Sequence, residues 1–229
     1  MNRDFAGVET WVFDLDNTLY PPSARLFDQI EARMTRYVMR ELGLDREAAD
    51  HLRDTFWRNH GTTLAGLMRN HGIDPEPYLA EVHDIDLSGL RPDPALARAL
   101  VALPGRRIVH TNGARAHAER VTRALGLEGL FDALYGIEDA GYAPKPERDA
   151  FLRICARDGF DPARAAMFED DPRNLHVPAD LGMVTVLVGA PRYEADFIHH
   201  HADDLTAFLH RIAPAARRRA PLAGSDGAG

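Results

Sequence analysis

Residues 8–22 read VETWVFDLDNTLYPP, and this stretch decides the fold because an apolar strand, an acidic turn and a helix-breaking pair follow one another in it. The segment from Val8 to Leu15 is short and apolar, which predicts a buried strand that ends at an acidic turn. Pro21 and Pro22 are unsuited to the interior of a helix, because proline lacks the backbone N–H that the helix needs. A different kind of structure is therefore expected to start after residue 20.

From about residue 24 to about residue 80 the periodicity becomes helical, and no strand pattern is present. Apolar side chains recur every three or four residues at the start of this segment, as on the buried face of a helix. They are Leu26, Ile30, Met34, Tyr37 and Val38. We expect one helix to end at Leu42, a second to span residues 46–60, and a third to run from Thr62 or Thr63 to the glycine at position 72. Residues 21–90 are therefore predicted to form a small all-helical insertion.

After Pro92 the chain alternates between helical and strand patterns. Helices are expected over residues 93–103, 114–125, 149–158 and 173–181, and strands over residues 106–111, 131–136, 165–168 and 184–188. Such alternation predicts a parallel sheet with helices on both faces. The fold class is therefore α/β, with a Rossmann-like doubly wound core built from residues 1–20 and 91–213 and a helical cap, residues 21–90, inserted after the first strand. Residues 214–229 are rich in Ala, Gly, Pro and Arg, which predicts a disordered tail.

The composition limits the partners and the compartment. A formal net charge of −8 argues against nucleic acid or an anionic membrane as the main partner. Cys155 is the single cysteine, so an internal disulfide is impossible and a reducing compartment fits. The N-terminal residues lack the apolar stretch of a signal peptide, and no run approaches the roughly 18 apolar residues of a membrane span. We expect a cytoplasmic protein, a monomer or homodimer, whose histidine run at 199–201 is exposed to solvent.

Polar residues follow four of the predicted strands. They are Asp14-Leu15-Asp16-Asn17-Thr18, Thr111-Asn112-Gly113, Lys145 between two prolines, and Glu169-Asp170-Asp171. In a parallel α/β sheet the carboxyl ends of the strands meet at one edge, where ligands bind. The sequence therefore predicts that these four sites form one crevice.

The residue types in this crevice indicate phosphoryl chemistry. Five carboxylates, at positions 14, 16, 169, 170 and 171, would repel one another unless a cation lay among them. Oxygen ligands without a nearby histidine or cysteine favour a hard ion such as Mg²⁺. Magnesium beside a lysine and a hydroxyl suits a phosphoryl group. Asp14 and Asp16 lie two residues apart on the same side, so that one can attack phosphorus while the other moves protons.

The stretch Asp14-Leu15-Asp16-Asn17-Thr18-Leu19-Tyr20 resembles the first motif of the haloacid dehalogenase-like hydrolase superfamily. The other three sites follow the remaining motifs of that superfamily in the same order, and the resemblance covers roughly residues 8–210. It implies a Rossmann-like core with a helical cap inserted after the first motif. That architecture agrees with the one expected from the patterns alone.

The resemblance also implies roles for the residues. Asp14 would be the nucleophile and would give one carboxylate oxygen to magnesium. Asp16 would be the general acid/base, with its backbone carbonyl as a metal ligand. Lys145 would neutralise the phosphate and orient Asp14. Asp170 would ligate the metal directly, with Glu169 assisting.

The phosphate oxygens would be held by Thr111 and by the backbone amides of Asn112 and Gly113, while Thr18 joins the substrate-binding set through the first motif. Asn174 lies four residues beyond Asp170, which matches the spacing of the superfamily and favours Asp170 as the direct metal ligand. Whether Asp171 rather than Glu169 assists the metal stays open at this point.

The closer resemblance is to pyrimidine 5′-nucleotidases of this superfamily. It rests on residues 16–20, on the segment Gly61-Thr62-Thr63-Leu64-Ala65-Gly66-Leu67, and on Phe168-Glu169-Asp170 with Arg173-Asn174-Leu175. It implies pyrimidine nucleoside 5′-monophosphates as substrates, with Tyr20, Thr62 and Thr63 as candidate walls of the substrate pocket. The alternative is a phosphatase for another small ester, such as a sugar phosphate or phosphoglycolate.

Three rival functions fit less well. A receiver-type signalling domain also groups aspartates, a threonine and a lysine around magnesium, but it would not begin with an Asp-x-Asp pair or contain a long helical insert. Hydrolytic dehalogenation needs no metal, so it leaves Asp16, Glu169 and Asp170 without a purpose. A phosphate-binding scaffold without turnover would not need the complete catalytic set.

Overall fold

Strand β1 (Thr10–Phe13) lies inside a parallel sheet of six strands in the computed structural model, which describes residues 5–189 and 191–216. The order across the sheet is β3 (Ala133–Tyr135), β2 (Arg106–His110), β1, β4 (Ala165–Glu169), β5 (Val184–Val188) and β6 (His200–Ala202). Phe13 pairs in register with Val109 of β2 and with Phe168 of β4. The residues that follow, Asp14 and Glu169 among them, therefore reach the carboxyl edge of the sheet at the same level.

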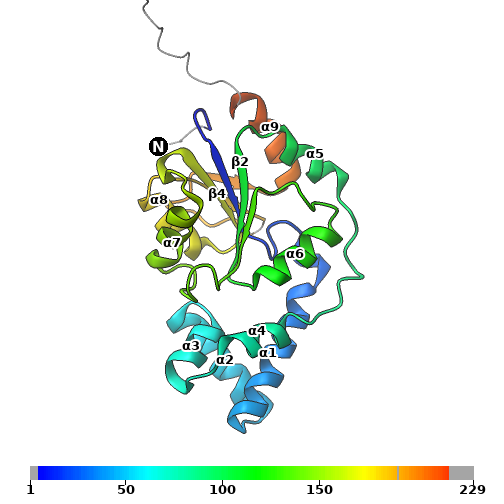
Figure 1. Ribbon diagram of the computed structural model, residues 1–229, viewed down its shortest axis with the longest axis vertical. Helices are drawn as coiled ribbons and strands as arrows, with labels where there is room; N and C mark the ends of the chain where they lie inside the picture. The colour runs from blue at the N-terminus through cyan, green and yellow to red at the C-terminus, as the bar shows by residue number, and fades with distance from the viewer. Residues whose placement is uncertain (1–4, 190, 217–229) are drawn as a thin grey trace, which may run out of the picture.

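Helices cover both faces of the sheet, as Figure 1 shows. They are α5 (Pro94–Ala102), α6 (Arg115–Ala124), α7 (Arg148–Asp158), α8 (His176–Asp180) and α9 (Leu205–Ala216), with short 3₁₀ turns η2 (Pro162–Arg164) and η3 (Pro172–Leu175). Because successive strand residues point to opposite faces, Trp11 and Phe13 pack into the core under α5, α6 and α9, whereas Val12 packs with α7 and α8. The α/β fold class with a doubly wound parallel sheet is confirmed.

Residues 21–90, hereafter the helical segment, follow β1 after the turn η1 (Pro22–Ala24). This segment holds α1 (Leu26–Leu42), α2 (Arg46–His60), α3 (Thr63–His71) and α4 (Pro75–Val82). Asp45, Thr62 and Asp74 accept hydrogen bonds from backbone N–H groups in the first turns of α2, α3 and α4, which satisfies donors that a helix start leaves free. The sequence patterns gave three helices, the last ending at Gly72, and did not identify α4.

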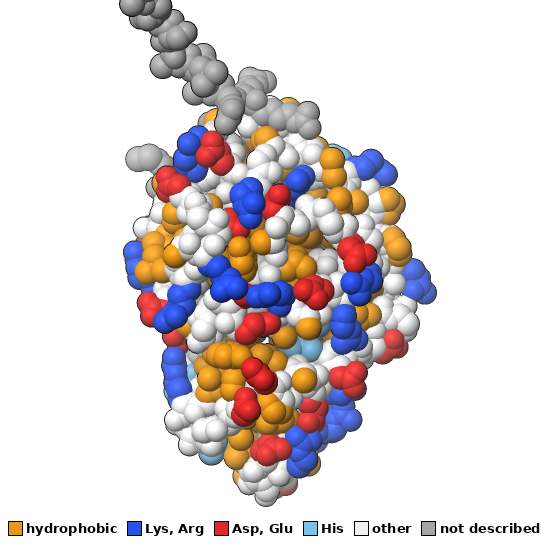
Figure 2. All heavy atoms as spheres, viewed as in Figure 1, with side chains coloured by type: hydrophobic (Ala, Val, Ile, Leu, Met, Phe, Trp, Pro, Cys, Tyr) orange, Lys and Arg blue, Asp and Glu red, His pale blue; other side chains and the backbone are white. Residues whose placement is uncertain are grey.

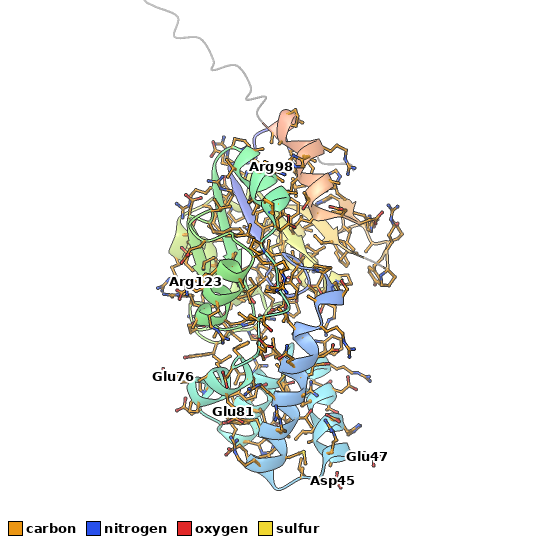
Figure 3. The ribbon with its side chains drawn as sticks, turned by 90° about the vertical axis from the view of Figure 1, so that its right-hand side faces the viewer. Asp45, Glu47, Glu76, Glu81, Arg98 and Arg123 are labelled. Carbon is orange, nitrogen blue, oxygen red and sulfur yellow. The ribbon has the colours of Figure 1, made fainter. Side chains whose placement is uncertain are left out.

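The helical segment leaves and rejoins the α/β part at neighbouring points. The side-chain amide of Gln29 donates to the carbonyl oxygen of Asp86 at 3.1 Å and accepts from the Asp86 N–H at 3.1 Å. Arg120 of α6 donates to the carbonyl oxygens of His83 and Ile85, both at 2.8 Å, and so holds the end of α4. In Figure 3, Asp45 and Glu47 lie at the end of the segment far from the sheet, and Glu76 and Glu81 of α4 lie nearer to it.

Three expectations from the sequence are wrong in detail. The helix expected over residues 173–181 is divided into η3 and α8, because Pro178 has no N–H to donate to the carbonyl of Asn174. The histidine run is not a solvent-exposed stretch, since His200 and His201 are half-buried in β6 and the ring of His199 accepts a hydrogen bond from the Thr185 N–H at 3.0 Å. Residues 214–216 belong to α9 rather than to the tail, and the remaining tail, 217–229, lies outside the described residues.

The surface carries both signs of charge. On the face drawn in Figure 2, acidic and basic side chains alternate over the described residues and leave no broad region of one sign. In the part of the chain that the structure describes, every helix is too short or too polar to cross a membrane.

Candidate active site

A cavity of about 580 Å³ lies between the carboxyl edge of the sheet and the helical segment. Most of the residues expected at the site line it, namely Asp14, Asp16, Thr62, Thr63, Thr111, Asn112, Gly113, Lys145, Glu169 and Asp170. Parallel strands explain this convergence, because the polar groups that follow β1, β2 and β4 all emerge at one edge. Two expected residues, Thr18 and Tyr20, do not line the cavity and are buried beside it.

The ammonium of Lys145 occupies the centre of the site. Its Nζ donates to Asp14 Oδ1 at 2.7 Å, to Glu169 Oε2 at 2.7 Å and to the carbonyl oxygen of His110 at 2.9 Å, so all three of its protons are used. Lys145 is only 1% exposed. Burial alone would lower the pKa of Lys145, but the negative charges of Asp14 and Glu169 outweigh burial and raise it. The lysine therefore stays charged and fixes the position of both carboxylates.

Asp14, Glu169 and Asp170 form a group of carboxylates whose nearest oxygens all lie within 4.8 Å of one another. Burial and mutual repulsion raise the pKa of Asp14 to about 7, that of Glu169 to about 7 and that of Asp170 to about 6, even though Lys145 acts in the opposite direction. Such a group is unfavourable with protein charges alone, and a bound cation would relieve the repulsion. Only oxygen donors are present in it, which fits a hard divalent ion.

Asp171 lies in a different environment from its two neighbours. Its carboxylate accepts from the backbone N–H of Arg173 at 3.0 Å, which caps η3, and makes further hydrogen bonds to the Arg173 guanidinium, the shortest at 2.6 Å. With its charge compensated by Arg173, Asp171 is not part of the carboxylate group. This geometry favours Glu169 over Asp171 as the assisting residue that the sequence left open.

The carboxylate of Asp16 is held by two donors that meet at one oxygen. Tyr20 Oη donates to Asp16 Oδ1 at 2.6 Å, and His117 Nε2 lies 2.9 Å from the same atom. Burial would raise the pKa of Asp16, but the contacts with His117 and Tyr20 keep it below its usual value. Tyr20, expected as a pocket wall, thus contacts Asp16 instead of facing the cavity.

His83, at the end of α4, connects the helical segment to this pair. Its ring stacks on the His117 ring, with 4.4 Å between centroids and 19° between planes. Its Nδ1 contacts the carbonyl oxygen of Leu79 at 2.9 Å, which identifies Nδ1 as the protonated nitrogen of a neutral ring. Burial and the neighbouring His117 lower the pKa of His83 to about 3. Sequence reasoning missed both histidines; the only signal was that His117 follows Gly113 by one helical turn.

The loop after β2 is joined by a pair of reciprocal hydrogen bonds to the loop that carries Lys145, hereafter the lysine loop. Asn112 Nδ2 donates to the Lys145 carbonyl at 3.1 Å, and the Lys145 N–H donates to Asn112 Oδ1 at 2.8 Å. Thr111 Oγ1 accepts from the Gly113 N–H at 2.9 Å, so the hydroxyl keeps its own proton for a further acceptor. The Gly113 amide, expected to bind phosphate, is thus occupied by Thr111.

The helical segment contacts the lysine loop at Gly61, which separates α2 from α3. Its φ is +81°, and a β-carbon there would lie 3.0 Å from the carbonyl oxygen of Lys145. Only glycine suits both conditions. Thr62 accepts from the Ala65 N–H at 3.1 Å as the cap of α3, and Thr63 forms the first residue of that helix. This close approach brings both threonines to the cavity.

Comparisons with known proteins agree with the geometry. A family model described as haloacid dehalogenase-like hydrolase matches residues 8–182. The chain is also similar to Phosphate metabolism protein 8 of Saccharomyces cerevisiae, with 26% identity over 209 residues. That alignment covers 83% of this chain and 65% of the yeast protein, so the chain spans less than two thirds of that relative.

Solved structures with the same fold include a HAD phosphatase from Thermococcus onnurineus, with a TM-score of 0.62 and 16% identity over 93% of this chain and 99% of that one. Another is the L-2-haloacid dehalogenase of Xanthobacter autotrophicus, with a TM-score of 0.56 and 19% identity over 89% of this chain and 97% of that one. At these identities the likeness concerns the fold, which serves both chemistries. Since the family model spans most of the sequence, the chain belongs to the haloacid dehalogenase-like hydrolases.

Proposed function

We propose that the chain is a magnesium-dependent phosphomonoester hydrolase that acts through an aspartyl-phosphate on Asp14, with pyrimidine nucleoside 5′-monophosphates as substrates. The observation that carries the proposal is the arrangement around Lys145. One buried ammonium holds Asp14 and Glu169, while Asp170 completes a carboxylate group with the spacing of metal ligands. A nucleophile, a fixed cation and metal ligands in one place are what phosphoryl transfer requires.

Mg²⁺ suits the donor set because the group offers carboxylate oxygens alone. In this proposal Asp14 and Asp170 supply side-chain oxygens, Asp16 supplies its backbone carbonyl, and Glu169 assists. When bound, the ion would neutralise charge on the transferred phosphoryl group. A metal-free dehalogenase would not need Glu169 and Asp170 in this position.

In the first step a carboxylate oxygen of Asp14 attacks phosphorus, and the bond between phosphorus and the leaving oxygen breaks. Asp16 gives a proton to that oxygen. Tyr20 and His117 both contact Oδ1 of Asp16, so Oδ2 is the atom that exchanges the proton. A dianionic phosphoryl group nearby favours the protonated form of Asp16. In the second step Asp16 takes a proton from water, the water oxygen attacks phosphorus, and the bond to Asp14 breaks to release inorganic phosphate.

The phosphoryl oxygens would be held by groups of the core. The Thr111 hydroxyl has a proton to donate, the backbone N–H of Asn112 lies beside it, and the Lys145 charge keeps Asp14 oriented. None of these groups distinguishes one monoester from another. Selection of the leaving group is therefore assigned to the helical segment, acting as a cap, whose Thr62 and Thr63 line the cavity.

The size of the cavity, about 580 Å³, is typical of sites for small organic ligands and exceeds what a lone phosphate needs. The resemblance of the first motif and of residues 61–67 to pyrimidine 5′-nucleotidases supports a nucleotide. The name of the yeast relative connects that protein with phosphate metabolism, which agrees with a phosphorylated substrate.

A panel of phosphate monoesters tests the proposal, with phosphate release measured in Mg²⁺ and in a chelator. UMP and CMP are expected to give the highest kcat/KM, ahead of AMP, GMP, sugar phosphates and 2-phosphoglycolate. A higher kcat/KM for AMP or for a sugar phosphate would refute the pyrimidine assignment without contradicting the phosphatase activity. Release that is equally fast without any divalent metal would refute the magnesium dependence.

A further inference from the structure

Two residues of the helical segment that line the cavity each carry a buried polar atom without a partner among the described residues. Tyr78 of α4 is 1% exposed, and its hydroxyl has no hydrogen-bond partner among the described residues. Arg53 of α2 lines the same cavity, and its Nε–H is likewise buried and unpartnered within the described part of the chain. A buried donor without a partner is costly, so two of them on one wall indicate a site built for an absent acceptor.

The other nitrogens of Arg53 are already used. Nη1 donates to Thr35 Oγ1 at 2.8 Å and to Asp50 Oδ1 at 3.2 Å, and Nη2 lies 3.4 Å from Glu31 Oε1. These contacts fix the guanidinium and compensate its charge, so Nε is the donor that remains. Arg53 also lies near enough to Tyr78 for its positive charge to act on the Tyr78 hydroxyl.

The charges around this wall decide which ligand it suits. Glu31, Asp50 and Asp54 also line the cavity on this side. With Arg53 neutralised by two of these acids, a carboxylate or a second phosphate would meet net repulsion. A neutral group with lone pairs meets two donors instead. The remaining surface there is apolar, from Ile30 and Leu79 among others, and suits a flat ring.

We propose that Tyr78 and Arg53 form a subsite that binds an uncharged acceptor, such as a carbonyl oxygen of a pyrimidine base, on the leaving group of the substrate. The subsite rests on the proposed phosphatase function, because it assigns the group that is lost when the phosphoryl bond breaks. It also predicts selection against leaving groups that carry a carboxylate.

The test compares UMP with ribose 5-phosphate, which keeps the sugar and the phosphate and lacks the base. The kcat/KM ratio of UMP over ribose 5-phosphate is expected to fall roughly 5- to 30-fold in Tyr78→Phe, the loss for one unmade buried hydrogen bond. Tyr37→Phe is the matched control. Its ring meets the Tyr78 ring edge-on at 4.9 Å, but Tyr37 does not line the cavity, so the ratio should stay unchanged.

A binding measurement separates this subsite from catalysis. Calorimetry on Asp14→Asn should show tighter binding of UMP than of ribose 5-phosphate, and Asp14→Asn/Tyr78→Phe should lose that preference. An unchanged ratio in Tyr78→Phe, or an equal fall in Tyr37→Phe, overturns the subsite and leaves water as the partner of these donors. Equal binding of both ligands by Asp14→Asn also overturns it, whether or not Tyr78→Phe folds. Preferential UMP binding by a chain that hydrolyses no monoester would instead refute the proposed phosphatase function and support the subsite.

Discussion

The guanidinium carbon of Arg173 lies 3.6 Å from the centroid of the Trp57 ring. Arg173 belongs to η3, which follows β4, and Trp57 belongs to α2 of the helical segment, so the contact joins the two parts beside the cavity that both residues line. Asp171 accepts hydrogen bonds from the same guanidinium, the shortest at 2.6 Å. The result is a chain of contacts from the residues beside the carboxylate group to the helical segment.

We expect Trp57→Leu to lower kcat/KM by roughly 2- to 30-fold, because a partly exposed cation–π contact contributes about 0.5–2 kcal/mol. Trp57→Phe keeps an aromatic face and should recover most of the loss. Steady-state kinetics on UMP measures both variants. Equal losses in Leu and Phe would show that volume at position 57, rather than the aromatic face, is what matters.

Asp14→Asn should abolish turnover, because an amide does not attack phosphorus. The variant should still fold, since removal of one buried carboxylate relieves repulsion with Glu169. Phosphate release measures turnover, and thermal melting shows whether the variant is folded. Activity above a few per cent, with contaminating phosphatases excluded, would contradict the assignment of Asp14 as nucleophile.

Asp16→Asn should lose about 10²–10⁴-fold in rate with a nucleotide, the range for a general acid. An aryl phosphate, whose leaving oxygen needs less protonation, should lose less in the phosphorylation step. His117→Ala is expected to show the same pattern with a smaller loss, because His117 positions Asp16 without reaching the substrate. Equal losses for both substrates would argue against proton transfer by Asp16.

Stability should depend on magnesium and on pH together. The raised pKa values of Asp14 and Glu169, about 7 against ordinary values of 3.8 and 4.5, mean that the metal-free folded state binds more protons than the unfolded chain between about pH 4 and pH 7. This contribution to the free energy of unfolding therefore falls as pH rises through that range. Mg²⁺ competes with the same protons, so the rise in Tm on adding it should be larger at about pH 8 than at about pH 5.5.

Two variants control that experiment. Asp170→Asn should remove most of the magnesium effect on Tm, whereas Asp171→Asn should keep it, because Asp171 pairs with Arg173 outside the carboxylate group. The reverse ranking would move the metal ligand by one residue along the chain.

Gly61→Ala should reduce both stability and activity. Alanine at a φ of +81° is strained, costing more than about 1 kcal/mol, and its β-carbon would press on the carbonyl oxygen of Lys145. Gly43→Ala is the matched control, since Gly43 has a φ of +64° with open space around it. Gly43→Ala should lower Tm with unchanged kcat. A similar kcat in the two variants would show that the contact between Gly61 and the Lys145 carbonyl does not affect catalysis.

The convergence of Asp14, Lys145 and Glu169 could be predicted because each follows a strand, and the carboxyl ends of parallel strands all lie at one edge of the sheet. The pairing of His83 with His117 could not, because it depends on how α4 packs against α6 and leaves no periodic signal. The same holds for Tyr78, which reads as an ordinary core residue on the buried face of α4. Its unpartnered hydroxyl becomes visible only in three dimensions.

Short elements were the hardest to predict. Strand β6 spans only His200–Ala202. A run of histidines is typical of a polar loop, so the strand is identified only by its pairing with β5. Residues expected to form one helix divide at His176, since Pro178 breaks the hydrogen-bond ladder without preventing α8. Local patterns identify long, amphipathic elements well, whereas pairing with a distant strand decides the short ones.

The reciprocal hydrogen bonds between Gln29 and Asp86 have a consequence for protein engineering. The polypeptide enters and leaves the helical segment at adjacent points, so its two covalent connections to the α/β part lie close together. We expect a different helical module with neighbouring ends to be accepted at this point without displacing β1 or α5. Under the proposed function, such an exchange should change which phosphate ester is preferred while the hydrogen bonds of Lys145 to Asp14 and Glu169 are kept.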